Sequence, residues 1–191
     1  MKFLVVVDMQ KDFIEGSLGT EQARSIVLNV VNKVNNARDN GDIIFYTLDS
    51  HNSEEYPDTI EGMNLPVQHC IEGTDGWTMN KLVWLAIAAN PLEKVYCVQK
   101  DTFGSPELID KIVNAILSWG MPEEIEFIGL CTDFCVIANA IIVQAGFPTI
   151  PISVDAACLA GSTPEKHDMA LNTMKNMFIK INNENKEPWR M

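Results

Sequence analysis

The sequence predicts a three-layer α/β/α fold with a doubly wound, mainly parallel β-sheet. Short apolar runs rich in β-branched residues alternate along the chain with longer segments whose apolar residues recur at helical spacing. Several of the short runs are apolar at successive positions, which is typical of strands that helices cover on both faces. This alternation over 191 residues predicts a single domain, spanning residues 1–191.

Five segments are predicted to be strands, each a short apolar run with β-branched or aromatic residues. They are KFLVVVD (2–8), DIIFYTL (42–48), KVYCVQ (94–99), EIEFIGL (124–130) and TIPISVD (149–155).

Helices are predicted between and after these strands. Residues 21–39 have apolar side chains every three to four positions, and Asn40-Gly41 ends the pattern. Ser105-Pro106 is expected to start a later helix, because serine caps helices and proline is favoured at the first helical position. The predicted helices cover residues 21–39, 78–89, 106–119, 133–145 and about 163–178.

Composition excludes several classes of function. The formal net charge of -12 argues against nucleic-acid and anionic membrane partners, which need clustered Lys and Arg. The first apolar run is short and ends at Asp8, so no secretory signal is expected. Five scattered cysteines match neither a disulfide framework nor paired zinc spacing. We therefore expect a reduced, cytoplasmic protein.

Two long segments, 9–20 and 49–77, interrupt the alternation, and irregular segments of this length are usually functional or disordered. Open parallel sheets bind ligands beyond the carboxyl ends of their strands. Four chemically active residues lie at or just past such ends, and they are Asp8, Asp49, Lys100 and Cys131. We expect the site at this edge of the sheet.

Cys135 is the candidate nucleophile. If Thr132 or Asp133 caps the helix that begins there, the thiol lies in its first turn, where the helix dipole favours a thiolate. Asp8 could then act as base and Lys100 could hold charge between them. The alternatives are that Cys135 is a small buried hydrophobe, as most free cysteines are, that Asp8 is a structural acid, and that Lys100 is solvated.

A metal site is predicted in the second long segment. Asp49 and His51 lie two residues apart, His69 can return from the far end of the loop, and Glu61 is a fourth candidate. Two imidazoles and a carboxylate suit Zn²⁺, Mn²⁺ or Fe²⁺. The alternative is that these groups bond to loop backbone. His167 is expected to be a surface or capping residue without a role.

Five blocks, in order along the chain, resemble the isochorismatase-like cysteine hydrolases, particularly the nicotinamidase/pyrazinamidase branch. They are VVVDMQKDF (5–13), LDSH (48–51), LPVQHC (65–70), QKDTFGS (99–105) and GLCTDFCV (129–136). The resemblance implies the isochorismatase-like hydrolase fold. It also implies hydrolysis of nicotinamide through a thioester, which would place the chain in NAD salvage.

The resemblance assigns roles to individual residues. It implies a catalytic triad of Asp8, Lys100 and Cys135, an oxyanion hole from the backbone amides of Cys131 and Cys135, and a cis peptide between Leu130 and Cys131. Phe13 and Phe103 match positions that line the substrate ring. The implied cofactor is a divalent metal, with zinc expected, on Asp49, His51, His69 and, in place of a further histidine, Glu61. No organic cofactor is implied, and members are commonly homo-oligomers.

Other functions remain open at this point. Another small-amide or N-carbamoyl hydrolase, an isochorismatase, and a non-catalytic binding protein share the fold. Cys131 and Cys135 could also form a redox pair. Asn52 follows His51 where many nicotinamidases have an aromatic residue, and Leu65 stands where a tryptophan often begins its block. These two departures affect the choice of nicotinamide among small-amide substrates more than they affect the expected cysteine chemistry.

Overall fold

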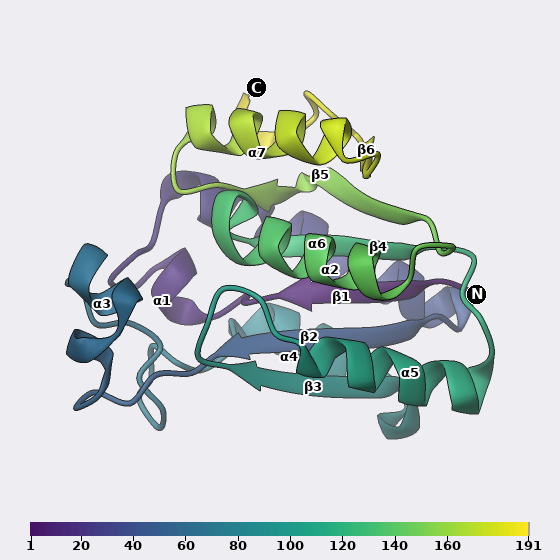
Figure 1. Cartoon of the computed structure of the whole chain (residues 1–191), viewed down its shortest axis with the longest axis horizontal. Helices are drawn as coiled ribbons and strands as arrows, with labels where there is room; N and C mark the ends of the chain where they lie inside the picture. The colour runs from purple at the N-terminus through teal and green to yellow at the C-terminus, as the bar shows by residue number, and fades with distance from the viewer. Residues whose placement is uncertain (191) are drawn as a thin grey trace.

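The structure is a computed structural model that describes residues 1–190, and a six-stranded sheet in the order β3-β2-β1-β4-β5-β6 forms its centre (Figure 1). Each pair of neighbouring strands is parallel, so the predicted doubly wound parallel sheet is confirmed. The strands are β1 Phe3–Val7, β2 Ile43–Asp49, β3 Val95–Lys100, β4 Ile125–Leu130, β5 Ile152–Ala160 and β6 Lys180–Asn182.

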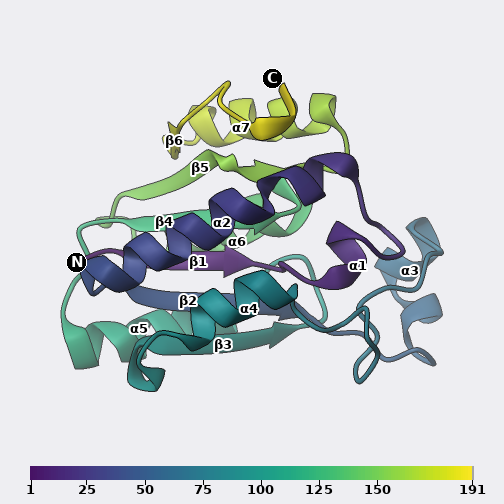
Figure 2. The ribbon, with the colours of Figure 1, turned by 180° about the vertical axis from the view of Figure 1, so that it is seen from behind.

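Helices cover both faces of the sheet and complete the three predicted layers. Helices α5, α6 and α7 lie on the face that Figure 1 shows, and α2 and α4 lie on the face that Figure 2 shows. Their apolar sides and the two sheet faces form two buried cores, one per face. The helices are α1 Lys11–Ile14, α2 Glu21–Asn40, α3 Ile60–Asn64, α4 Lys81–Ala88, α5 Glu107–Trp119, α6 Ile137–Gly146 and α7 Pro164–Asn176.

Local chemistry explains where the longest helices begin and end. The Thr20 side chain accepts a hydrogen bond from the Ala23 amide at the start of α2, and Gly41 ends that helix with φ 74°. Thr163 accepts from the Lys166 amide at the start of α7. Helix α5 instead has Pro106 at its cap position and no side-chain cap, so the capping role expected of the preceding serine is wrong.

Several segments differ from the sequence prediction, and the short helices α1 and α3 form inside the two segments expected to be irregular. Strand β5 starts later than expected and continues through the apolar run to Ala160, with a register shift against β4. Strand β6, with the short sequence KIN, carries too little apolar pattern to be recognised from sequence. The helix expected over 133–145 begins with a π-helical turn, Thr132–Val136, before α6.

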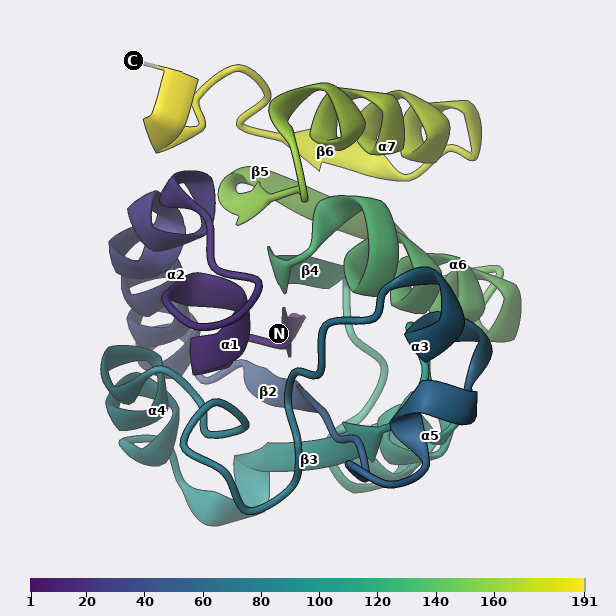
Figure 3. The same ribbon diagram turned by 90° about the vertical axis from the view of Figure 1, so that its left-hand side faces the viewer.

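The carboxyl ends of the strands share one edge of the sheet with α1 and α3 (Figure 3). The strand order reverses direction between β1 and β4, and this topological switch point is where open parallel sheets bind ligands. Within residues 1–190, no helix combines the length and the apolar character that a membrane crossing requires.

Candidate active site and metal centre

Lys100, the last residue of β3, makes the central contacts of the site. Its Nζ lies 2.6 Å from Asp8 Oδ2, 3.1 Å from Asp49 Oδ1 and 3.5 Å from Cys135 Sγ. Strand register accounts for part of this arrangement, because Lys100 is directly paired with Asp49 at the end of β2. The structure therefore brings the three residues of the expected triad together and joins them to a carboxylate of the expected metal site.

Asp8 follows β1 in a backbone conformation that is uncommon for a residue other than glycine. Its φ is 45°, in the left-handed region, which costs about 1–3 kcal/mol and recurs at functional sites. Thr47 on β2 forms hydrogen bonds with both the backbone amide and the carboxylate of Asp8. The Asp8 amide donates to Thr47 Oγ1 at 3.1 Å, and the Thr47 hydroxyl donates to Asp8 Oδ1 at 2.5 Å. The other carboxylate oxygen is left to face Lys100.

Burial and charge act in opposite directions on the buried groups of this site. Burial raises the pKa of Asp8, whereas Lys100 and the Thr47 hydroxyl act to lower it. Burial also raises the pKa of the Cys135 thiol well above its usual range, against the charge of Lys100. Burial would lower the pKa of Lys100, but the charges of Asp8 and its other neighbours raise it. Burial therefore favours the neutral form of the Cys135 thiol, and the contact with Asp8 favours the protonated form of Lys100.

The turn that carries Cys135 is not capped as expected. Neither Thr132 nor Asp133 caps it, because Thr132 Oγ1 lies 2.8 Å from His167 Nδ1 and Asp133 accepts hydrogen bonds from the amide and hydroxyl of Ser162. Cys135 nevertheless lies in the first turn after β4 and is 4% exposed. The position near a helix start is confirmed, and the capping residues are wrong.

A glycine allows the strand before this turn to pass close to β1. Gly129 has φ 113°, and a Cβ at this position would lie 2.1 Å from the carbonyl oxygen of Val7. No other residue fits without displacing the strand. The peptide bond between Leu130 and Cys131, which follows, is cis, as the family resemblance implies.

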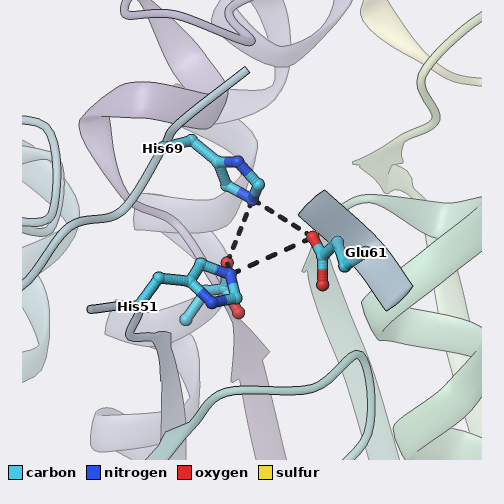
Figure 4. Close-up of side chains that lie close together, drawn as sticks. His51, Glu61 and His69 are labelled. Atoms are coloured by element: carbon cyan, nitrogen blue, oxygen red, sulfur yellow. Dashed lines mark ion pairs between the residues drawn. The ribbon is translucent and has the colours of Figure 1, made fainter. Parts of the chain in front are cut away.

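The four expected metal ligands form one cluster beside Lys100. Figure 4 shows His51, Glu61 and His69 pointing toward one another, and Asp49 completes the group, with one ligand atom of each within 4.8 Å of the others. His69 Nε2 lies 3.3 Å from both Asp49 Oδ2 and Glu61 Oε1. His51 Nε2 lies 2.9 Å from Asp49 Oδ2 and 4.0 Å from Glu61 Oε1.

The two imidazoles are oriented as metal ligands would be. His69 Nδ1 lies 2.9 Å from the Val67 carbonyl oxygen, so Nδ1 carries a hydrogen and Nε2 is the ring nitrogen that faces the cluster. His51 Nε2 is buried and, despite its short distance to Asp49, makes no hydrogen bond of acceptable geometry. The Tyr56 ring packs edge-on against both imidazoles and its hydroxyl donates to a loop carbonyl. The residues fit a divalent cation.

The charges in the cluster also favour a cation. Burial alone would raise the pKa of Asp49, but the two imidazoles and Lys100 hold it below its ordinary value. Burial would lower the pKa of His69, but its contacts with Asp49 and Glu61 raise it to about 10. The two carboxylates thus stabilise positive charge at the position that a divalent metal would occupy.

Three further residues that the sequence did not single out hold the site together. Gln10 is fully buried, donates to the carbonyls of Asp49 and Trp77 at 2.7 and 2.9 Å, and accepts from the Asp49 amide at 2.8 Å. Thr47 orients the carboxylate after β1. Asn139, one helical turn after Cys135, bonds the Cys135 carbonyl and the backbone of residues 103 and 105. Thr47 and Asn139 stand in apolar stretches of the sequence, whereas Gln10 lies among charged residues and has no such signal.

The two expected substrate-ring residues lie in different environments. Phe13 is buried, with its ring 5.3 Å from that of His69. Phe103 is 39% exposed and packs at 5.1 Å against Phe134, which the sequence did not single out. A polar cavity of about 310 Å³ opens nearby and reaches this site only through Lys100; its other lining residues are Ser50, Asn52, Glu55, Glu72, Gln99 and Asp101.

His167 is neither a surface residue nor a capping residue, so the expectation for it is wrong. Its side chain is fully buried on α7 and lies between Thr132 and Glu187, with its Nε2 atom 3.2 Å from Glu187 Oε1. The expectation failed because the partner Glu187 comes from the C-terminal segment, beyond the last predicted element.

Known proteins resemble this chain in sequence and in fold. The family model described as the isochorismatase domain matches residues 2–184. The uncharacterized isochorismatase family protein PncA of Bacillus subtilis (strain 168) is 29% identical over 184 residues, which cover 92% of this chain and 94% of that protein. Among solved structures, nicotinamidase PncA from Bacillus subtilis matches with a TM-score of 0.80 at 25% identity, over 95% of this chain and 99% of that chain. Pyrazinamidase of Pyrococcus horikoshii in complex with zinc shares the fold, with a TM-score of 0.75 at 24% identity over 94% and 97% of the two chains.

Proposed function

The chain belongs to the isochorismatase family, and from this premise we propose that it is a cysteine-dependent amidohydrolase that converts nicotinamide and water to nicotinate and ammonia. The observation that carries the proposal is the set of contacts of Lys100. One buried ammonium contacts the expected base Asp8, the expected nucleophile Cys135 and the metal-site carboxylate Asp49. A fold shared with a nicotinamidase over 95% of the chain supports the choice of substrate.

The first half of the reaction forms a thioester. Asp8 accepts the proton of Cys135 while the sulfur attacks the amide carbonyl carbon, because the neutral resting thiol needs a base at the moment of attack. The carbonyl oxygen becomes an oxyanion, which the amides of Cys131 and Cys135 bind; one such donor contributes about 3–4 kcal/mol. Asp8 returns the proton to the amide nitrogen, the carbon–nitrogen bond breaks and ammonia leaves.

The second half hydrolyses the thioester. Asp8 accepts a proton from water, whose oxygen attacks the thioester carbon, and the same two amides bind the second oxyanion. The carbon–sulfur bond breaks, the proton returns to Cys135 and nicotinate leaves. Lys100 keeps its proton throughout, since the charges around it raise its pKa. Its positive charge stabilises Asp8 and Cys135 whenever either of them is anionic.

Asp49, His51, His69 and Glu61 would hold a divalent metal, and we propose zinc because two nitrogens and two carboxylates suit it, with Mn²⁺ and Fe²⁺ as alternatives. When bound, the metal would supply a Lewis acid for the pyridine nitrogen or for a water next to it. Phe13 and Phe103 would contact the ring. A metal held there would help to orient the ring and so the amide relative to the sulfur, which is a contribution of orientation rather than of bond breaking.

Ammonia release from nicotinamide tests the proposal. We expect wild-type activity, at least a thousandfold less in Cys135→Ala, and most of the activity in Cys131→Ser, the matched control on the same turn. An active Cys135→Ala variant excludes the covalent mechanism. Loss of activity in both variants indicates a redox pair or the wrong sulfur.

A panel of substrates separates the alternative functions. Nicotinamide, pyrazinamide, an N-carbamoyl amino acid and isochorismate are compared by kcat/KM at equal enzyme concentration. A higher value for the N-carbamoyl compound or isochorismate reassigns the substrate within the family. No turnover of any of them, with binding of nicotinamide measured by calorimetry, indicates a non-catalytic binding protein.

A further inference from the structure

One buried side-chain amide joins the turn of the nucleophile to the loop that follows Lys100. Asn139 on α6 is 0% exposed, and it bonds to three backbone atoms. Its Nδ2 donates to the carbonyl oxygens of Cys135 and Phe103 at 2.8 and 3.0 Å, and its Oδ1 accepts from the Ser105 amide at 3.0 Å. Burying an amide is costly unless its polar atoms are paired, so these bonds favour one placement of the loop on α6.

The two bonds to the loop flank Gly104. The amide donates to the residue before this glycine and accepts from the residue after it. A carboxylate at the same position could only accept. Gly104 allows the close approach, since a Cβ there would lie 2.6 Å from Ile142 Cδ1 and 3.2 Å from the backbone carbonyl carbon of Ala138. The loop therefore lies directly against α6, at a distance that the side-chain amide sets.

The Phe103 side chain depends on this loop for its position. It is 39% exposed, and its ring packs at 5.1 Å against that of Phe134, so burial restrains it only in part. The two ends of the loop are held more firmly. Lys100 holds one end through its buried ion pairs, and Asn139 holds the other. The backbone of the loop thus places the exposed ring relative to the sulfur.

We propose that Asn139 is a positioning residue for the substrate ring: one amide holds the Phe103 backbone and the Cys135 carbonyl, and so sets the distance between the ring contact and the nucleophile. This inference rests on the proposed function, in which Phe103 contacts the ring and Cys135 attacks the amide carbon. Asn139 contacts neither the substrate nor a reacting atom. Because it acts through a binding contact, its loss should change KM more than kcat.

The test measures kcat and KM for nicotinamide in Asn139→Thr. A threonine hydroxyl can donate to the carbonyl four residues earlier, that of Cys135, but it lies one bond short of the loop. We expect KM to rise about threefold, less than the rise of about fivefold in Phe103→Ala, with kcat within about twofold of wild type. Asn139→Leu also loses the bond to Cys135, so KM should rise equally and kcat should fall.

A matched control and a double variant separate this role from general support of the fold. Asn114→Thr, at an exposed asparagine on α5, should resemble wild type. If Asn139 acts through Phe103, the KM of Phe103→Ala/Asn139→Thr should lie within about 1.5-fold of that of Phe103→Ala, because the contact is already lost. Independent effects would multiply to about 15-fold over wild type.

Three results overturn the inference: a multiplied KM in the double variant, a wild-type KM in Asn139→Thr, or a wild-type KM in Phe103→Ala. Circular dichroism verifies that each variant folds, and Asn139→Ser, which has a smaller side chain with the same hydroxyl, gives the same comparison if Asn139→Thr does not fold. If wild type releases no ammonia, the proposed function fails and the inference fails with it. Contrary KM values in an active wild type overturn the inference alone.

Discussion

Replacing Thr47 by valine removes a hydroxyl from the buried carboxylate that we assign as the base. The hydroxyl donates to Asp8 Oδ1 at 2.5 Å and accepts from the Asp8 amide at 3.1 Å, so both bonds are lost in a side chain of nearly the same shape. A hydrogen bond to a charged group contributes about 1.5–3 kcal/mol. Loss of this bond destabilises the ionised form of Asp8, whose pKa burial already raises.

The lower end of this range corresponds to about one pH unit, since about 1.4 kcal/mol shifts a pKa by one unit. The sign follows from the charge: the bond favours the carboxylate, so its removal raises the pKa of Asp8 further. Asp8 must be ionised to accept the thiol proton. We therefore expect the acid limb of the kcat/KM profile to move up by about one unit in Thr47→Val, with the plateau at higher pH less affected.

The assay is ammonia release from nicotinamide at a series of pH values, with circular dichroism at each to verify folding. Thr47→Ser keeps the hydroxyl and is the matched control, so its acid limb should lie within about 0.3 unit of wild type, a small fraction of the shift expected from losing the bond. An acid limb that stays in place in Thr47→Val, or moves to lower pH, refutes the assignment of Asp8 as the base. An equal shift in both variants shows that the effect does not come from the hydroxyl.

Three further predictions concern the metal centre, the buried His167 and the substrate ring. Glu61→Gln should weaken zinc binding by on the order of 10-fold or more in a competition titration with a chromogenic chelator. The control Glu55→Gln, at an exposed glutamate, should bind zinc as wild type does. Equal zinc affinities of Glu61→Gln and wild type would remove Glu61 from the ligand set. Burial lowers the pKa of His167 below 6.5, so the unfolded chain binds a proton that the folded chain does not, and the free energy of unfolding should fall as pH drops below about 6.5. In urea titrations, the change in the free energy of unfolding per pH unit should be smaller in His167→Asn by at most about 1.4 kcal/mol. An unchanged value would contradict a neutral His167 in the folded protein. Phe103→Ala should raise KM for nicotinamide about fivefold with kcat little changed, as loss of about 1 kcal/mol of ring contact implies. The control Phe178→Ala, at a highly exposed phenylalanine, should leave KM unchanged. A KM in Phe103→Ala equal to that of wild type would remove Phe103 from the site.

Much of the fold was predictable because it depends on repeating local patterns. Strands such as β1 and β4 are apolar at successive positions, and α2 carries its apolar residues at helical spacing between a threonine cap and a glycine. The carboxyl ends of parallel strands share one edge, so Asp8, Asp49 and Lys100 were expected near one another, and the structure places them there.

The parts of the site that were missed have no such pattern. Gln10, Thr47 and His167 each make their contacts through one side chain to a residue at least 20 positions away. Nothing repeats along the sequence around them, so only the packed chain reveals the partner. The supposed caps of the nucleophile turn were wrong for the same reason, since distant residues compete for those side chains.

The sequence by itself determined the alternation of the five longer strands with the longer helices, the edge of the sheet where the site lies, and the residue types available there. Only the tertiary structure decided which of them touch. Lys100 became the common partner of two carboxylates and a thiol, and Glu61 reached the histidines from a short helix within a long loop. Local patterns follow from the backbone periods of helices and strands, whereas such contacts depend on side-chain directions and on strand register, which are settled only when the core packs.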